Sequence, residues 1–172
     1  MVGPRPRDDP GRDASNGRRS ETDTSRYTTA TFLSALIPAA VARRVVRVSI
    51  ETDRDVYDRD DPVEITVDFK NPLPVPVNVP TPEQRRWGWT IDGRLEASDE
   101  RRYTRDRPSS FDFGGGERKR TSFTWNGRFE RVRDGAHRES VLPDPGEYEI
   151  RVFVATHEGA FEPSDSTTIT IR

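Results

Sequence analysis

The segment that decides the fold is Val63-Glu64-Ile65-Thr66-Val67-Asp68-Phe69-Lys70, in which apolar and polar residues alternate without a break. Successive side chains of a β-strand point to opposite faces, so this period of two predicts a strand with one face in a core and the other in solvent. The segment 45–51 alternates in the same way. Between the two lies the polar stretch 53–62, which is rich in aspartate and ends in proline. This pattern predicts two half-buried strands joined by a charged turn.

Most of the remaining chain continues the period of two. Five further segments alternate: 75–79, 87–91, 119–125, 148–154 and 167–171. The third of the seven strands, 75–79, is interleaved with prolines, which cannot donate to a ladder, so we expect it at a sheet edge. The polar segment 96–116 and the charged stretch after Asn126-Gly127 are expected to be loops. Together these features predict an all-β, antiparallel sandwich of about seven strands.

The first 31 residues have a different composition. Apolar residues are rare between Met1 and Thr31. Such a segment cannot bury enough apolar surface to offset an ordering cost of about 1–2 kcal/mol per residue. We therefore divide the chain into a disordered tail (1–31), one short amphipathic helix (32–43) that Pro38 bends, and the β-sandwich (44–172).

Residues 32–42 also have a second interpretation. The stretch is apolar and ends in Ala40-Val41-Ala42, which resembles a secretory region with a small-residue cleavage site. About thirty polar residues precede it, which is unlike a signal peptide. We expect a packed helix and a cytoplasmic protein, with export as the alternative.

Charge and composition exclude several classes of function. The chain has 28 basic and 30 acidic residues and a net charge of -2, so it lacks the basic field of a nucleic-acid-binding protein. It has no cysteine, which excludes disulfides and thiolate metal sites. No stretch reaches the roughly 18 apolar residues that span a bilayer. Lys70 and Lys119 are the only lysines, and this preference for arginine suggests a GC-rich, salt-adapted archaeal source.

No motif for catalysis or cofactor binding is present. The aspartates of 53–61 lack the spacing of a calcium loop, and His137 and His157 have no second ligand nearby. The run 114–121 contains three glycines and basic residues but lacks the glycine that precedes the Lys-Ser/Thr pair of a P-loop. No Gly-x-Ser-x-Gly motif occurs. We expect no enzyme activity, no cofactor and no metal.

Short motifs carry a family resemblance. The opening 56–63, the strand end Phe69-Lys70-Asn71-Pro72, and the stretch 142–148 resemble bacterial and archaeal immunoglobulin-like modules. The resemblance implies a tyrosine corner in 142–148, with Gly146 and Tyr148 as structural residues and the Tyr148 hydroxyl bonded to upstream backbone. With Thr124-Trp125-Asn126-Gly127 added, the chain from about 45 to 172 also resembles the BsuPI-type intracellular proteinase inhibitor domain and uncharacterised haloarchaeal proteins.

The three tryptophans have two interpretations. Exposed tryptophans stack on sugars or anchor protein partners. However, Trp87 and Trp89 share one face of a strand, and Trp125 ends another, which is typical of a sandwich core. We expect all three to be structural.

These features predict a non-enzymatic interaction or accessory module that binds another protein and is itself a monomer. The last strand has no proline, so Thr168 and Thr170 mark it as the edge for strand addition, and Phe111 and Phe113 mark the loop 96–113 as a second surface. The alternatives are a protease inhibitor of the BsuPI type, which would use that loop, and a carbohydrate-binding or cell-surface domain, which would use exposed tryptophans.

The division of the chain gives a first prediction. Limited proteolysis of the full chain should remove residues 1–31 and leave a resistant fragment that begins near residue 32, because only the latter part has the composition of a core. Mass spectrometry of the time course identifies the fragment. Persistence of the intact chain would contradict the prediction.

Overall fold

The computed structural model describes residues 37–97, 107–133 and 137–172. Within these ranges the chain is mostly β-structure with one helix, which confirms the all-β prediction. The elements in order are α2 (Ala39–Val45), β1 (Arg47–Thr52), β2 (Val56–Tyr57), β3 (Val63–Lys70), β4 (Val77–Thr81), β5 (Trp87–Ile91), β6 (Arg94–Leu95), β7 (Ser109–Phe113), β8 (Arg118–Trp125), β9 (Phe129–Arg133), β10 (His137–Val141), β11 (Gly146–Val154) and β12 (Ser164–Ile171).

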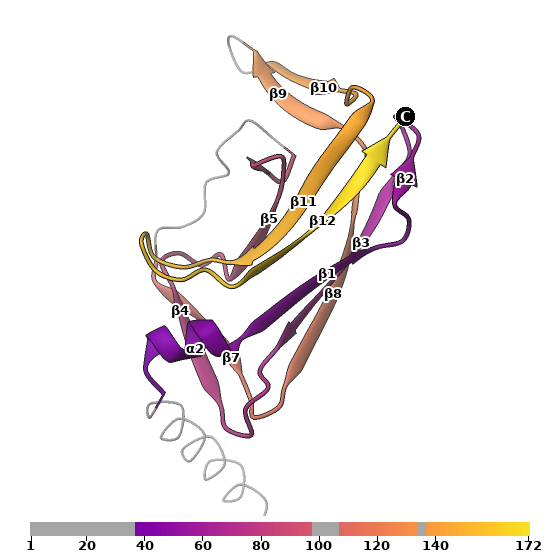
Figure 1. Cartoon of the computed structure of the whole chain (residues 1–172). Coiled ribbons are helices and arrows are strands. Elements are labelled where there is room, and N and C mark those ends of the chain that lie inside the picture. The colour runs from indigo at the N-terminus through magenta and orange to yellow at the C-terminus, as the bar shows by residue number, and fades with distance from the viewer. Residues whose placement is uncertain (1–36, 98–106, 134–136) are drawn as a thin grey trace, which may run out of the picture.

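Two sheets face each other and form an immunoglobulin-like β-sandwich (Figure 1). One sheet has the strand order β1-β3-β8, and the other has the order β2-β12-β11-β5-β6. The strands β4 and β7 form a separate pair, as do β9 and β10. The described pairings are antiparallel except that β2 joins β12 in parallel.

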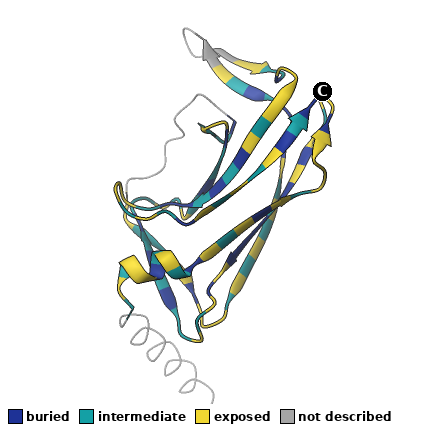
Figure 2. Ribbon diagram, viewed as in Figure 1, coloured by how far each residue is buried: buried dark blue, intermediate teal, exposed yellow. Residues whose placement is uncertain are grey.

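The core consists of the alternate residues of the facing strands. Val63, Ile65, Val67 and Phe69 of β3 are buried, as the alternation of the sequence predicts. Their counterparts on the second sheet are Ile91, Ile150, Val152, Val154, Ile169 and Ile171. Figure 2 shows the resulting alternation of buried and exposed residues along these strands.

The first strand of the sandwich changes sheets. β1 pairs with β3 in the first sheet, and β2 pairs with β12 in the second. At the crossing, Tyr57 is 1% exposed and its hydroxyl donates to Oδ1 of Asp53 at 2.7 Å. The same oxygen accepts the backbone N–H of Glu64 at 3.0 Å, and the Tyr57 hydroxyl accepts the N–H of Arg54 at 3.0 Å. The polar stretch 53–62 is therefore a hydrogen-bonded crossover between sheets.

These hydrogen bonds shift the ionisation of both side chains. The hydrogen bond from Tyr57 is the largest influence on Asp53 and holds the pKa of its carboxyl below the usual value. Burial, followed by the hydrogen bond to Asp53, raises the pKa of Tyr57 to about 12. A charged carboxylate and a neutral phenol are the forms that this pair stabilises.

A buried asparagine links the end of β3 to the start of β8. The Asn71 side chain donates to the carbonyls of Val75 and Gly114, each at 2.8 Å, and accepts the N–H of Leu73. The backbone of Pro74 approaches Gly115 so closely that any Cβ there would collide with its carbonyl. The glycine-rich run is therefore a tight turn into β8.

Two segments expected to be loops contain strands. Phe111 and Phe113 lie in β7, where they pair opposite Val79 and Val77 of β4. The charged stretch after Gly127 forms the hairpin β9–β10. Apolar and charged residues are mixed in both segments, so the local pattern was too weak to compete with tertiary pairing. The proline-rich strand is β4, which has β7 as its strand neighbour among the described residues.

The helix differs from its predicted bounds. It runs from Ala39 to Val45 with Pro38 as its N-cap, so the proline precedes the helix and does not bend it. Ala42 is fully buried, and the helix packs on β4. The predicted tail (1–31) and the first part of the predicted helix (32–36) lie outside the described residues.

The two tyrosines of the fold give a second prediction. The Tyr148 hydroxyl donates to the carbonyl of Asp144 at 2.8 Å in exposed surroundings, so Tyr148→Phe should cost about 1 kcal/mol. Tyr57→Phe should cost more, about 1–2 kcal/mol, because the hydroxyl of this buried side chain makes two hydrogen bonds, one to Asp53 and one from the N–H of Arg54. Urea denaturation at pH 7 measures both variants. Equal midpoints for wild type and Tyr57→Phe would contradict the structural role of the crossover.

Candidate functional site

One flank of the sandwich is closed by the crossover. The backbone N–H of Ile50, on the free side of β1, donates to Oδ2 of Asp165 in β12 at 3.1 Å. β2 occupies the end of β12, where the N–H of Thr170 donates to the carbonyl of Asp55 at 2.8 Å. This flank is therefore occupied at Ile50 of β1 and at Thr170 and Ile171 of β12.

These contacts differ between the two residues predicted for strand addition, because β2 pairs beside Thr170 but not beside Thr168. Their strand is an inner strand, with β11 on one side and β2 on the other. The outer-face position of both side chains was read correctly, but an open edge requires a missing neighbour, which alternation does not report. We therefore do not retain β12 as the edge for strand addition.

The opposite flank has an unpaired strand edge at β8. All eight residues of β8 pair with β3, and no second strand pairs with β8 among the described residues. We call this the β8 edge. It has no proline, and its residues are exposed at alternate positions.

The register shows which main-chain groups face outward. The N–H of Asn71 donates to the carbonyl of Glu117 at 2.9 Å, so these two residues form a hydrogen-bonded pair between the strands. Such pairs alternate with non-bonded pairs in an antiparallel ladder. The residues that bond to β3 are therefore Lys119, Thr121, Phe123 and Trp125. The N–H and C=O groups of Arg118, Arg120, Ser122 and Thr124 point to the β8 edge.

Aromatic side chains lie beside this edge, in the layer between the sheets. The ring centroids of Trp89 and Phe123 are 4.9 Å apart, and those of Trp87 and Phe123 are 5.9 Å apart. All three rings pack on the core but remain half-buried. Trp125 is 3% exposed, and its Nε1 donates to the carbonyl of Arg128. The tryptophans thus contribute to packing, and two of them stay partly accessible.

The first part of the β8 edge carries a charge on its inner face. Lys119 lies opposite Phe69, its Nζ is 5.5 Å from the centroid of the Phe113 ring, and it forms an ion pair with Glu117 at 2.8 Å. The hydrogen bond from this lysine is the main cause of the lowered pKa of Glu117. An inward charge on an edge strand hinders non-specific pairing. The unhindered part of the edge begins at Thr121.

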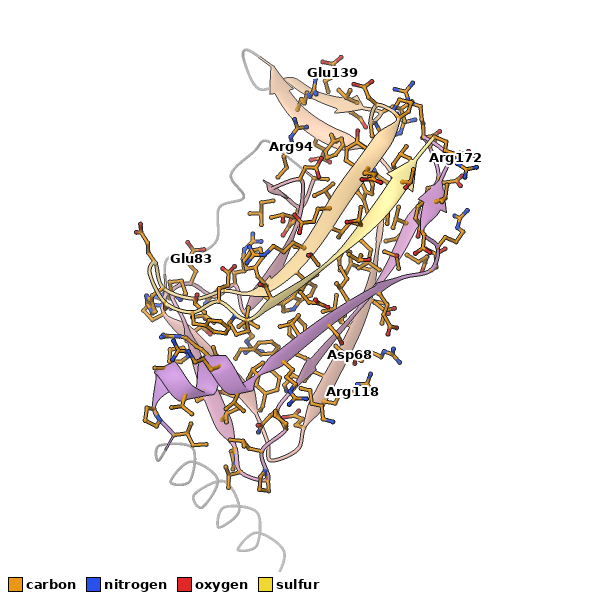
Figure 3. The ribbon with its side chains drawn as sticks, viewed as in Figure 1. Asp68, Glu83, Arg94, Arg118, Glu139 and Arg172 are labelled. Carbon is orange, nitrogen blue, oxygen red and sulfur yellow. The ribbon has the colours of Figure 1, made fainter. Side chains whose placement is uncertain are left out.

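The outer face beside the edge is organised around one carboxylate. Asp68 of β3 is nearly buried and accepts Nε and Nη2 of Arg118 at 2.7 and 2.6 Å (Figure 3). Nε of Arg120 lies 3.3 Å from the same carboxylate. These contacts, led by the Arg118 hydrogen bonds, hold the pKa of Asp68 below its usual value.

The other predicted contact residues are not available to a partner. Phe111 and Phe113 are 6% and 2% exposed, because the β4–β7 pairing turns them into the core against Phe69. They are core residues of a strand and not part of an exposed loop. Gly146 is exposed and a Cβ there would meet no atom within 4 Å, so sterics do not require glycine at this position.

Acidic and histidine side chains are scattered over the described residues. In those ranges no group of three or more acidic or histidine side chains is arranged to hold a metal ion. The acidic groups with lowered pKa values are Asp53, Asp68 and Glu117, and in each the largest cause is a hydrogen bond to another side chain. The pKa of Tyr148 is raised, mainly by burial. No helix in the described ranges is long and apolar enough to cross a membrane.

A family profile matches residues 34–172, which includes the helix and the whole sandwich. Its description is "Family of unknown function (DUF7974)". The chain belongs to this family. No curated protein sequence matches the chain.

Solved structures with a related arrangement are distant from this DUF7974 chain. The CARDB domain of a Pyrococcus furiosus protein is 17% identical with a TM-score of 0.45, over 74% of this chain and 94% of that one. The sporulation control protein Spo0M from Bacillus subtilis is 16% identical with a TM-score of 0.46, over 74% of this chain and 49% of that one. A β-glucosidase from Listeria innocua is 14% identical with a TM-score of 0.39, over 73% of this chain and 16% of that one. We transfer no function from these similarities.

Sequence reasoning missed the β8 edge. The segment was recognised as a strand, but its neighbours were not, because pairing joins residues far apart in the chain. One signal was present: Lys119 stands on the apolar face of an otherwise regular alternation. An inward lysine is typical of an edge strand.

The register gives a third prediction. The amides of Ser122 and Thr124 should exchange with deuterium on the order of 100-fold faster than those of Thr121 and Phe123, because only the latter two bond to β3. Two-dimensional NMR of the full chain in heavy water measures these rates residue by residue. Slow exchange at all four positions would show that another segment pairs with β8.

Proposed function

We propose that this protein is a non-enzymatic module that binds an extended segment of another protein along the β8 edge. The observation that supports this function is the outward alternation of main-chain groups on β8, with no second strand beside it among the described residues. An incoming strand would complete the ladder, and such main-chain hydrogen bonds supply affinity in strand-addition complexes.

The other described strand edges of the sandwich favour this choice. Asp165 accepts the outward N–H of Ile50 in β1, and β2 pairs with the end of β12 at Thr170 and Ile171. β4 contains Pro80 and follows two further prolines. β5 is paired with β6, and the N–H of Glu96 donates to the carbonyl of Trp89 at 2.9 Å. β8 therefore offers more free main chain than these strands.

Side chains near the edge would supply selectivity. Alternate residues of an added strand would point inward, beside Thr121 and Phe123, toward the half-buried rings of Trp87 and Trp89. Partly exposed aromatic side chains are frequent anchors of protein interfaces. We therefore expect the aromatic rings and the β8 edge to contact the same bound segment.

The two alternative functions have less support. Sugar binding uses an open aromatic surface, whereas Trp87 and Trp89 are packed against Phe123 and Phe69. BsuPI-type inhibition was assigned to the loop 96–113, and residues 98–106 of that loop lie outside the described residues. The unpaired β8 edge therefore favours strand addition over these two alternatives.

The fourth prediction tests this function with a matched pair of variants. Ser122→Pro removes an outward N–H and places a ring at the edge, while the main-chain hydrogen bonds of Thr121 and Phe123 to β3 are spared. Ser122→Ala is the control, because both variants lose the hydroxyl contact with Thr66 but only Ser122→Pro loses the amide. Peptides selected from a random linear library against the wild-type full chain should bind Ser122→Ala normally and Ser122→Pro about 10-fold more weakly, a difference of about 1.4 kcal/mol.

A second measurement keeps the test decisive if Ser122→Pro does not fold by circular dichroism. Methylation of the backbone nitrogens that face β8 in a selected peptide should abolish binding. Methylation of the intervening nitrogens, which face away from β8, should leave binding unchanged. The proposed function would be overturned if selected peptides bound folded Ser122→Pro as tightly as Ser122→Ala. It would also be overturned if neither set of methylated nitrogens weakened binding.

A further inference from the structure

We propose that the segment bound at the β8 edge carries two acidic residues at alternate positions, directly after two apolar residues at alternate positions. This inference rests on the proposed function and specifies its partner. It follows from the charge on the outer face of β8, the aromatic rings on the inner face, and the register of an antiparallel strand.

Two exposed arginines on the outer face, Arg118 and Arg120, pair with the same buried carboxylate, Asp68. The side chains of Arg118 and Arg120 are 58% and 55% exposed, whereas that of Asp68 is 8% exposed. Asp68 is the nearest carboxylate to both, and Glu51 lies 3.8 Å from Arg120. Asp68 thus pairs with both arginines, the contact of Arg120 with the exposed Glu51 is longer, and both guanidinium groups remain more than half exposed.

The geometry of these arginines suits alternate carboxylates. Arg118 and Arg120 are two residues apart on one face of a strand, a separation of about 7 Å. An added strand has the same repeat, so its acidic residues at positions i and i+2 would each lie opposite one guanidinium. Guanidinium groups have five N–H donors, and the described contacts of Arg118 with Asp68 use Nε and Nη2. Donors therefore remain for an incoming carboxylate.

The inner face selects apolar residues at the other end. Positions opposite Thr121 and Phe123 on an added strand would face the rings of Trp87 and Trp89. The position opposite Lys119 is less suited to an apolar side chain because of the ammonium group. The apolar and acidic preferences therefore fall on different halves of the edge.

The register turns these preferences into an order along the partner chain. In an antiparallel pair, the residue opposite Phe123 comes first, followed by those opposite Thr121, Arg120 and Arg118. The expected pattern is apolar, any, apolar, acidic, any, acidic. β3 already presents most of this pattern to the other side of β8, with Ile65, Val67 and Asp68 opposite Phe123, Thr121 and Arg120.

The fifth prediction uses two synthetic peptides with blocked ends. The first contains Ile-Thr-Val-Asp-Thr-Asp, and the second contains Ile-Thr-Val-Lys-Thr-Lys. By fluorescence anisotropy with the full chain, the acidic peptide should bind about 10-fold more tightly at low salt, and the difference should shrink as salt screens the exposed charges. Arg120→Gln should reduce this preference because it removes one of the two guanidinium groups. The Arg118–Asp68 ion pair is retained in that variant, so β8 should keep its place beside β3. Ser122→Pro should weaken the binding of both peptides.

The outcomes separate this inference from the function on which it rests. Equal affinity for the two peptides, with both weakened by Ser122→Pro, would overturn the acidic preference and retain strand addition. Absence of binding for both peptides at millimolar concentration would overturn the proposed function and this inference together. Dimerisation of the wild type that Ser122→Pro abolishes, with no peptide bound, would identify a second copy as the occupant and also overturn both.

Discussion

The hydrogen bond from the Tyr57 hydroxyl to Asp53 fixes the crossover on which the shape of the sandwich depends. It holds the chain where the first strand leaves one sheet and enters the other. Because the segment from β1 to β2 pairs with both sheets, it links them along the flank formed by β1, β2 and β12. Tyr57 can serve this purpose at 1% exposure because its hydroxyl both donates and accepts a hydrogen bond.

Closure of one flank determines where an interaction surface remains. On that flank, Asp165 accepts the outward N–H of Ile50 in β1, and β2 pairs with Thr170 and Ile171 of β12. The β8 edge remains, with an inward lysine at one end and half-buried aromatic rings at the other. This distribution fits selective pairing better than general adhesion, since the inward charge disfavours apolar strands that lack a complementary polar residue.

Sequence patterns predicted the strands with regular alternation and missed those without it. The segments of β3, β11 and β12 were recognised because one face of each lies in the core. β7 and the β9–β10 hairpin were missed, since their apolar residues are interrupted by charges and their pairing is decided by neighbours in space. The same limitation placed Phe111 and Phe113 in an exposed loop, although the β4–β7 pair buries both.

The sequence by itself determined the alternation, the inward and outward faces of the main strands and the presence of two tyrosines near turns, because these depend on local periodicity and side-chain chemistry. Tertiary structure alone decided which strand has no neighbour. Thr168 and Ser122 both lie on the outer faces of regular strands, and their local sequences do not distinguish them. One is on an inner strand and the other at an open edge, because the first strand crosses to β12 and nothing in the described residues crosses to β8.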